Sequence, residues 1–136
     1  MTRQATQWTA QFAVAAELCK RGCEVSFTMG NCTPLADLMV LAPNGRMFLV
    51  DVKGQSTPNF WRIKAKAERD DLFYVLCYVG EAERNRFFPM SQRTLHDLME
   101  RYRWSGVKFD ENFSGFNWGD AKPFENLWDE LPLANL

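Results

Sequence analysis

Residues 36–54 read ADLMVLAPNGRMFLVDVKG, a stretch that predicts a β-hairpin carrying two acids and a lysine. Side chains two apart on a strand share a face, so Asp51 and Lys53 lie on one side of the second strand and Val52 on the other. Charged groups on apolar strands are costly to bury unless an opposite charge joins them. The pattern therefore indicates a divalent cation held by Asp37 and Asp51 beside Lys53. An ordinary Asp–Lys pair at a solvated strand end is the alternative.

The turn of this hairpin, Pro43-Asn44-Gly45, decides whether the two acids share a face. A two-residue Asn-Gly turn would place them on opposite faces. A three-residue loop pairs Ala42 with Arg46 instead, and it sets the acids opposite each other on one face. Proline suits the first position of this loop and glycine its left-handed position. The metal-site interpretation requires this loop or a bulge, and the sequence is compatible with it.

The composition is that of an ordinary globular protein, with 136 residues, 46% hydrophobic and 24% charged. We therefore expect a single domain over residues 1–136. The net charge of −1 does not favour nucleic-acid binding, because affinity for the backbone comes from neutralising phosphates. No signal peptide is evident, and no apolar run approaches the roughly 18 residues of a membrane span. We expect a cytoplasmic protein with no membrane partner.

The four cysteines and the single histidine argue against a zinc site, since the cysteines lack paired C-x-x-C spacing. Cys19 and Cys77 lie in apolar runs and are expected to be buried free thiols, as in a reducing cytoplasm. His96 is far in sequence from the acids. We expect it at a helix surface or cap rather than in a catalytic role.

The remaining patterns predict an α/β fold, a mixed sheet flanked by helices. Both strands of the hairpin are apolar on both faces, which predicts central strands covered on both sides. A polar, basic stretch follows the hairpin and is expected to contain a short helix. The predicted elements are a helix over 7–21 ended by Gly22, strands over 23–28, 36–42 and 47–54, a short helix within 56–70, strands over 72–79 and 86–89, and a helix from the N-cap Ser91 to Arg103.

A basic strip follows the hairpin, where residues 62–66 read RIKAK. Arg62, Lys64 and Lys66 are candidates for contacts with a nucleic-acid backbone. Most acids lie elsewhere in the chain, which is compatible with a local binding surface on an acidic protein. A charged, solvated face without a binding role is the plainer alternative.

The residues from Trp104 to Leu136 form an aromatic-rich C-terminal extension, with Phe and Trp among Gly, Asn and acids. Aromatic side chains at this density need a surface to bury against. We expect the extension to pack on the core or on a dimer partner. A stacking platform for unpaired bases is the alternative, and the acids of the extension argue against it.

These features together resemble the PD-(D/E)xK nuclease superfamily, in particular its archaeal Holliday-junction-resolvase-like and other small branches. The resemblance spans residues 7–80 as a nuclease-like core and leaves residues 81–136, a strand, a helix and the extension, without a counterpart. It implies a restriction-endonuclease-like core of order αβββαβ and a metal-dependent nuclease that hydrolyses phosphodiester bonds, with DNA favoured and RNA left open. The matching segments are QFAVAAELCKRG at 11–22, LAD at 35–37 and VDVKGQ at 50–55.

The resemblance also implies roles for individual residues. Asp37 and Asp51 would ligate Mg²⁺ or Mn²⁺ together with the carbonyl oxygen of Val52. The ion would lower the pKa of a bound water and offset charge on the phosphate. Lys53 would orient that water and contact the scissile phosphate, and Gln55 would position water or phosphate.

One position departs from the family pattern. The family's helix acid lies eleven residues before the glycine that ends the helix, and this chain has Gln11 there. Glu17 does not replace it, because the helical wheel puts Glu17 on the outward side. Gln11 accepts a hydrogen bond from a metal-bound water but brings no charge, which leaves a one-metal mechanism. An inactive nuclease-like module that binds nucleic acid or a protein is the competing interpretation, and a homodimer would suit cleavage of two strands.

Overall fold

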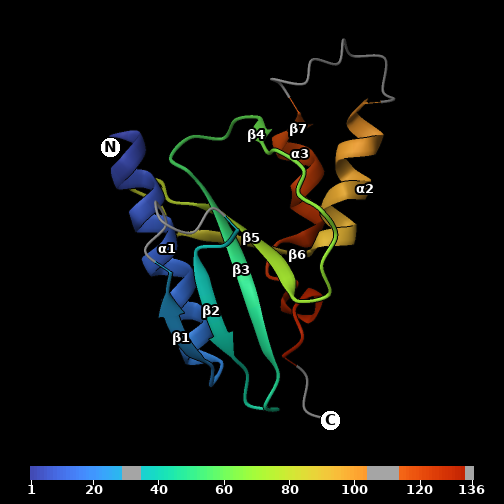
Figure 1. Ribbon diagram of the computed structural model, residues 1–136. Coiled ribbons are helices and arrows are strands. Elements are labelled where there is room, and N and C mark those ends of the chain that lie inside the picture. Colours follow the sequence, from blue (N-terminus) through green and yellow to red (C-terminus); the bar gives the residue numbers. More distant parts are fainter. Residues whose placement is uncertain (29–34, 104–113, 134–136) are drawn as a thin grey trace.

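The structure, a computed structural model, describes residues 1–28, 35–103 and 114–133 (Figure 1). The elements labelled η are 3₁₀ helices. In chain order the elements are α1 (Arg3–Lys20), β1 (Glu24–Phe27), β2 (Leu38–Leu41), β3 (Met47–Gln55), β4 (Trp61–Arg62), β5 (Leu72–Tyr78), β6 (Arg86–Ser91), α2 (Gln92–Arg103), β7 (Gly115–Phe116), α3 (Trp118–Ala121), η3 (Lys122–Phe124) and η4 (Trp128–Glu130).

A mixed five-stranded sheet of order β1-β2-β3-β5-β6 forms the centre of the protein. β3 and β5 run parallel, paired from Leu49–Leu72 to Gln55–Tyr78, and the other neighbours are antiparallel. β4 and β7 form a separate two-stranded sheet. The prediction of an α/β fold with a mixed sheet flanked by helices is confirmed.

Helices cover the two faces of this sheet (Figure 1). α1 packs mainly on β3 and also contacts β1 and β5, while α2 packs on β5 and β6. The core beneath α1 includes Val14, Leu18, Val50, Val52 and Cys77. The core on the α2 side includes Trp61, Tyr74, Phe88, Leu95 and Phe116.

The hairpin between β2 and β3 has the three-residue loop, one of the two turns considered and the one that suits the metal-site interpretation. The Ala42 N–H donates to the Arg46 carbonyl at 2.8 Å, and the ladder pairs Leu38 with Val50. Gly45 has a φ of 84°, the left-handed conformation that a side chain disfavours. This register brings Asp37, directly before β2, to the middle of β3.

Two helix starts are set by hydroxyl side chains. Thr2 accepts a hydrogen bond from the Ala5 N–H at 3.0 Å, so α1 begins at Arg3 rather than near Gln7. Ser91 caps α2 as predicted, because its Oγ accepts from the Thr94 N–H at 3.1 Å.

The short helix predicted within residues 56–70 is wrong. The chain there contains β4 and is otherwise irregular. Trp61 and Ile63 are each 1% exposed while Arg62 and Lys64 are exposed, the two-residue period of an extended chain. Burial of these apolar side chains favours the extended conformation over a polar helix.

The hairpin is not covered on both faces, which corrects a second prediction. Met39 and Met47 are 47% and 66% exposed on the face opposite α1. The reason is that α2 lies over β5 and β6 rather than over β2.

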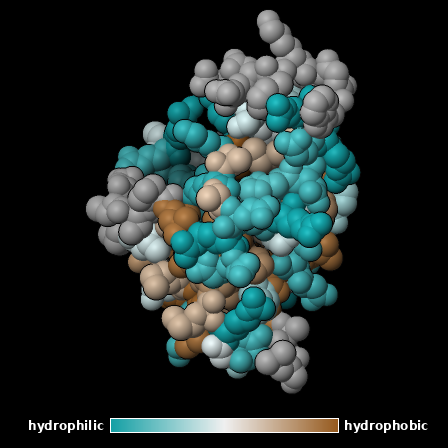
Figure 2. Space-filling model, turned by 45° about the vertical axis from the view of Figure 1, so that its right-hand side comes forward, coloured by the Kyte–Doolittle hydropathy of each residue, from teal (hydrophilic) through white to brown (hydrophobic). Residues whose placement is uncertain are grey.

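The part of the surface turned toward the viewer in Figure 2 is mainly hydrophilic, with hydrophobic residues exposed in separate areas.

The described part of the C-terminal extension packs on the core, as one of the alternatives predicted. The Trp61 and Trp118 rings stack with centroids 5.6 Å apart. Arg86 of β6 makes two hydrogen bonds of 2.8 Å to the Glu125 carboxylate. Buried hydrophobic residues in the described part of the extension are Phe116, Ala121, Trp128 and Leu131. Its first residues, 104–113, lie outside the described ranges.

The cysteines differ from expectation at one position. Cys77 is buried, and burial raises the pKa of its thiol to about 12. Cys19 is exposed because the inward stripe of α1 runs through Val14 and Leu18 instead. Cys32 lies outside the described residues. Within the described ranges, no helix is long and apolar enough to cross a membrane.

Candidate active site

Asp51 and Lys53 stand on the face of β3 that points away from α1. Val50 and Val52 belong to the core beneath α1, so the alternate residues face the other side of the sheet. Asp51 is only 2% exposed, and the Lys53 Nζ lies 3.2 Å from its Oδ1. Lys53 itself is 34% exposed and connects the buried carboxylate to the surface.

Asp37 joins this pair from the start of β2. Its Oδ2 accepts a 2.7 Å hydrogen bond from the Val52 N–H, and its Oδ1 accepts one from the Gln11 Nε2 at 3.3 Å. Burial raises the pKa of the Asp37 carboxyl above its ordinary value, and the negative charge of Asp51 raises it further. The Val52 hydrogen bond and the two lysines, Lys53 and Lys66, oppose that rise. The predicted acids are thus brought together.

Gln11 reaches the acids from α1, at the position where the resembled family carries an acid. It is 4% exposed, on the inward side of the helix as predicted. Its Nε2 contacts Asp37, and its Oε1 has no hydrogen-bond partner among the described residues. A buried acceptor without a donor is unfavourable by about 1–3 kcal/mol, so a water or a cation at this oxygen would stabilise the site. Glu17 pairs instead with Lys20 at 3.6 Å on the surface.

Gln7, one helical turn before Gln11, is a residue that sequence reasoning missed. Its Nε2 donates to the Val52 carbonyl at 2.8 Å, and its Oε1 accepts from the Gly54 N–H at 3.2 Å. The predicted metal ligand, the Val52 carbonyl, therefore already has one protein partner, and its second lone pair remains for another. A polar residue on the sheet-facing side of α1 is the signal that could have identified this role.

Gln55 lies at the end of β3, one step beyond Lys53 on the same face. Its Nε2 donates to the Phe60 carbonyl at 2.7 Å, so this side chain holds the following loop. Its Oε1 is buried without a partner among the described residues. The predicted role in positioning water or phosphate stays a prediction.

Lys66 enters the site from the predicted basic strip. Its Nζ donates to Asp51 Oδ2 at 2.6 Å and to the Leu35 carbonyl at 2.8 Å. Arg62 and Lys64, the other members of the strip, are exposed on the surface. Nothing in the sequence pattern separates Lys66 from them, because its position depends on where residues 62–71 cross the sheet.

The resulting cluster contains two carboxylates and two ammonium groups. Across residues 1–28, 35–103 and 114–133, no three His, Cys, Asp or Glu side chains form a metal-binding group. The oxygens available are those of Asp37 and Asp51 together with the unpartnered Oε1 of Gln11. Carboxylate and amide oxygens suit Mg²⁺ or Mn²⁺, so the donor set fits one such ion.

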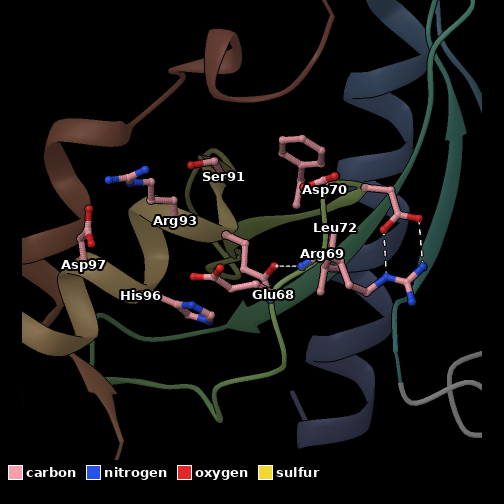
Figure 3. A pocket seen from close by; sticks show the side chains of 11 residues that line it. Glu68, Arg69, Asp70, Leu72, Ser91, Arg93, His96 and Asp97 are labelled. Carbon is pink, nitrogen blue, oxygen red and sulfur yellow. Dashed lines mark hydrogen bonds and ion pairs between the residues drawn. The ribbon is translucent and has the colours of Figure 1, made fainter.

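A cavity of about 930 Å³ lies away from these acids, between the start of β5 and the start of α2 (Figure 3). Its walls are residues 68–73, 91–93, 96 and 97, and none of the predicted metal ligands lines it. Arg69 makes hydrogen bonds of 2.8 and 3.0 Å to Asp71 there, which lower the pKa of that carboxyl. His96 lines this cavity and not the acid cluster.

Compared with protein-family models, with curated proteins and with solved structures, the chain matches none of them.

Proposed function

We propose that this chain is a metal-dependent nuclease with a restriction-endonuclease-like core. It would hydrolyse phosphodiester bonds of nucleic acid, DNA in the first instance, through Asp37, Asp51 and Lys53. The observation that carries the proposal is that Asp37, directly before β2, and Asp51 of β3 meet beside a lysine, with a buried amide oxygen of Gln11 left without a partner among the described residues. Burying two carboxylates side by side is unfavourable unless cations compensate them, and a bound metal ion is one such cation.

The four side chains have separate tasks in this proposal. Asp37 and Asp51 hold the cation, and the Gln11 Oε1 accepts a hydrogen bond from a water next to it. A bound Mg²⁺ or Mn²⁺ supplies a more acidic water and stabilises charge on the phosphate. Lys53, which is partly exposed, orients the attacking water and contacts the scissile phosphate.

The approach of nucleic acid is expected on the sheet face opposite α1. Asp51 and Lys53 stand on that face, and Met39 and Met47 are exposed over the hairpin. Arg62 and Lys64 are exposed on the segment that follows β3 and are candidates for contacts with phosphates flanking the site.

A second candidate function is a non-catalytic module of the same fold that binds nucleic acid or a protein. The observation that favours it is the charge balance of the cluster. Both oxygens of Asp51 already contact ammonium groups, from Lys53 and Lys66, so this buried carboxylate is neutralised without a metal.

Cleavage of labelled DNA and RNA substrates with Mg²⁺ or Mn²⁺ distinguishes the two. The nuclease predicts metal-dependent cleavage in the wild type and a loss of at least a hundredfold in Asp51→Asn. Exposed Asp129→Asn is the matched control and should retain activity. Lys53→Met should cleave poorly and still bind Mn²⁺, measured by calorimetry. A folded wild-type protein that cleaves no substrate would favour the non-catalytic module.

A further inference from the structure

The Lys66 side chain makes the shortest contact to the buried acid. Its ammonium lies 2.6 Å from Asp51 Oδ2, against 3.2 Å between Lys53 and the other oxygen. It also donates to the carbonyl of Leu35, two residues before Asp37. The Lys66 ammonium therefore bridges the entry to β2 and the middle of β3, the two segments that carry the metal-ligand candidates.

Gln92 of α2 fixes the backbone on which Lys66 stands. This glutamine is 5% exposed, and its Nε2 donates to the carbonyls of Lys66 and Ala67 at 3.3 and 3.0 Å. Its Oε1 accepts from the Arg69 N–H at 2.8 Å. Three hydrogen bonds from one buried amide hold this segment, so the lysine is placed by the fold and not only by its own flexible side chain.

Lys66 and a metal ion would compete for the Asp51 carboxylate. Each Asp51 oxygen has one ammonium partner, so a divalent cation coordinated by Asp51 would lie beside two positive charges. Like charges this close repel each other in a buried site, and this repulsion favours the departure of an ammonium group when the metal ion binds. Lys66 is 26% exposed, which leaves its head group a route to solvent.

We propose that the Lys66 ammonium is the resident cation of Asp51 in the metal-free protein and that a divalent cation displaces it. The proposal rests on the metal-dependent function proposed above. It makes Lys66 a positioning residue that keeps the buried acid paired with a positive charge in the absence of metal. It also lowers the affinity for metal, because the positive charge of the ammonium group opposes the arrival of a second cation at Asp51.

Metal affinity is the first test, measured as the Kd for Mn²⁺ by calorimetry without nucleic acid. Lys66→Met removes the charge at similar length and should tighten Mn²⁺ binding about tenfold, which is about 1.4 kcal/mol, because the ion then meets one positive charge fewer. Lys66→Arg keeps the charge and should stay within about twofold of the wild type. Lys64→Met, two residues away and exposed, controls for the general loss of one positive charge.

The outcomes separate this inference from the proposed function. If the wild type binds Mn²⁺ and Lys66→Met binds it with equal or lower affinity, the displacement is overturned and the metal site stands. Absence of Mn²⁺ binding in both proteins overturns the metal site and the displacement together. Binding in Lys66→Met alone supports displacement in its strongest form.

A measurement on the wild type covers the case in which Lys66→Met does not fold. Acetylation of lysine amines by an N-hydroxysuccinimide ester, followed by mass spectrometry, reports how accessible each ammonium is. Saturating Mg²⁺ should raise the rate at Lys66 severalfold and leave Lys64 unchanged. A Lys66 rate that Mg²⁺ does not alter would show that the lysine remains on Asp51.

Discussion

Asp37 is the acid of the cluster whose surroundings disfavour its charge. Burial is the main reason, and the neighbouring Asp51 adds to it, so the pKa of Asp37 is raised in the folded protein. A carboxyl with a raised folded pKa favours the native state most when it is protonated. Its stabilising contribution is complete below the ordinary pKa of 3.8 and is lost as the pH rises through the raised value.

Asp37→Asn should therefore stabilise the metal-free protein at pH 7. The amide keeps an oxygen for the Val52 N–H and removes the unfavourable charge. The gain should shrink as the pH falls and vanish below the ordinary carboxyl pKa. Urea denaturation in EDTA at several pH values measures this, and a variant less stable than the wild type at pH 7 would contradict it. Added Mn²⁺ should stabilise the wild type only.

Gln11→Glu would introduce the acid that the resembled nuclease family carries at this position and give the site three carboxylates. Without metal the new charge replaces a hydrogen-bond donor 3.3 Å from Asp37, so the melting temperature should fall. With Mn²⁺ the third carboxylate should tighten binding by about tenfold or more, because a divalent ion gains a charged ligand. Thermal melts with and without Mn²⁺ test both halves. Gln4→Glu, exposed on the same helix, is the control and should show neither effect.

At the scale of elements, the site depends on how closely α1 crosses β3. A Cβ added at Gly54 would lie 2.6 Å from the Ala10 Cβ and 3.2 Å from the Thr6 carbonyl oxygen. The absence of a side chain at this position lets Gln7 and Gln11 reach the strand and the acids. α1 is therefore both a cover for the core and a source of site residues.

Gly54→Ala should destabilise the protein by about 1–3 kcal/mol, because helix and strand must move apart to admit one methyl group. The same shift should weaken the contacts of Gln7 with β3. Urea denaturation gives the loss of stability. Gly119→Ala in α3 is the matched control, since nothing lies within 4 Å of its added Cβ, and it should be neutral or slightly stabilising. Equal stability of the two variants would argue against the close crossing.

At the scale of the whole molecule, the C-terminal extension completes the core. Trp128 is 6% exposed, and its ring lies 5.8 Å from that of Phe87 in β6. The Arg21 guanidinium at the end of α1 lies 4.5 Å over the same ring. One aromatic side chain thus joins the last described segment to the first helix and to the edge strand of the sheet.

Trp128→Ala should lower the free energy of unfolding by about 3–5 kcal/mol, the range for removing a large buried aromatic ring. Leu127→Ala, the adjacent residue at 41% exposure, should change it by less than about 1 kcal/mol. Chemical denaturation followed by circular dichroism compares the two. Similar small losses would mean that the extension does not contribute to the core.

The hairpin is the part of the fold that its own residues predict correctly. Proline and glycine in Pro43-Asn44-Gly45 specify a three-residue loop, and the loop sets the register that brings Asp37 toward Asp51. The alternation of Val50, Asp51 and Val52 follows from strand geometry alone. These interactions are local, so the sequence contains nearly all the information that determines them.

The rest of the site depends on which distant segments pack together. Lys66 and Gln7 contact β3 from stretches whose own patterns indicate only a basic strip and a helix. The extended conformation of residues 61–63 results from burial of Trp61 and Ile63 against the C-terminal extension and the sheet. Local propensity is weaker than the burial of large apolar side chains, and that burial depends on the tertiary arrangement. The two acids, Lys53 and Gln11 were therefore predictable, and the contacts of Lys66 and Gln7 with β3 were not.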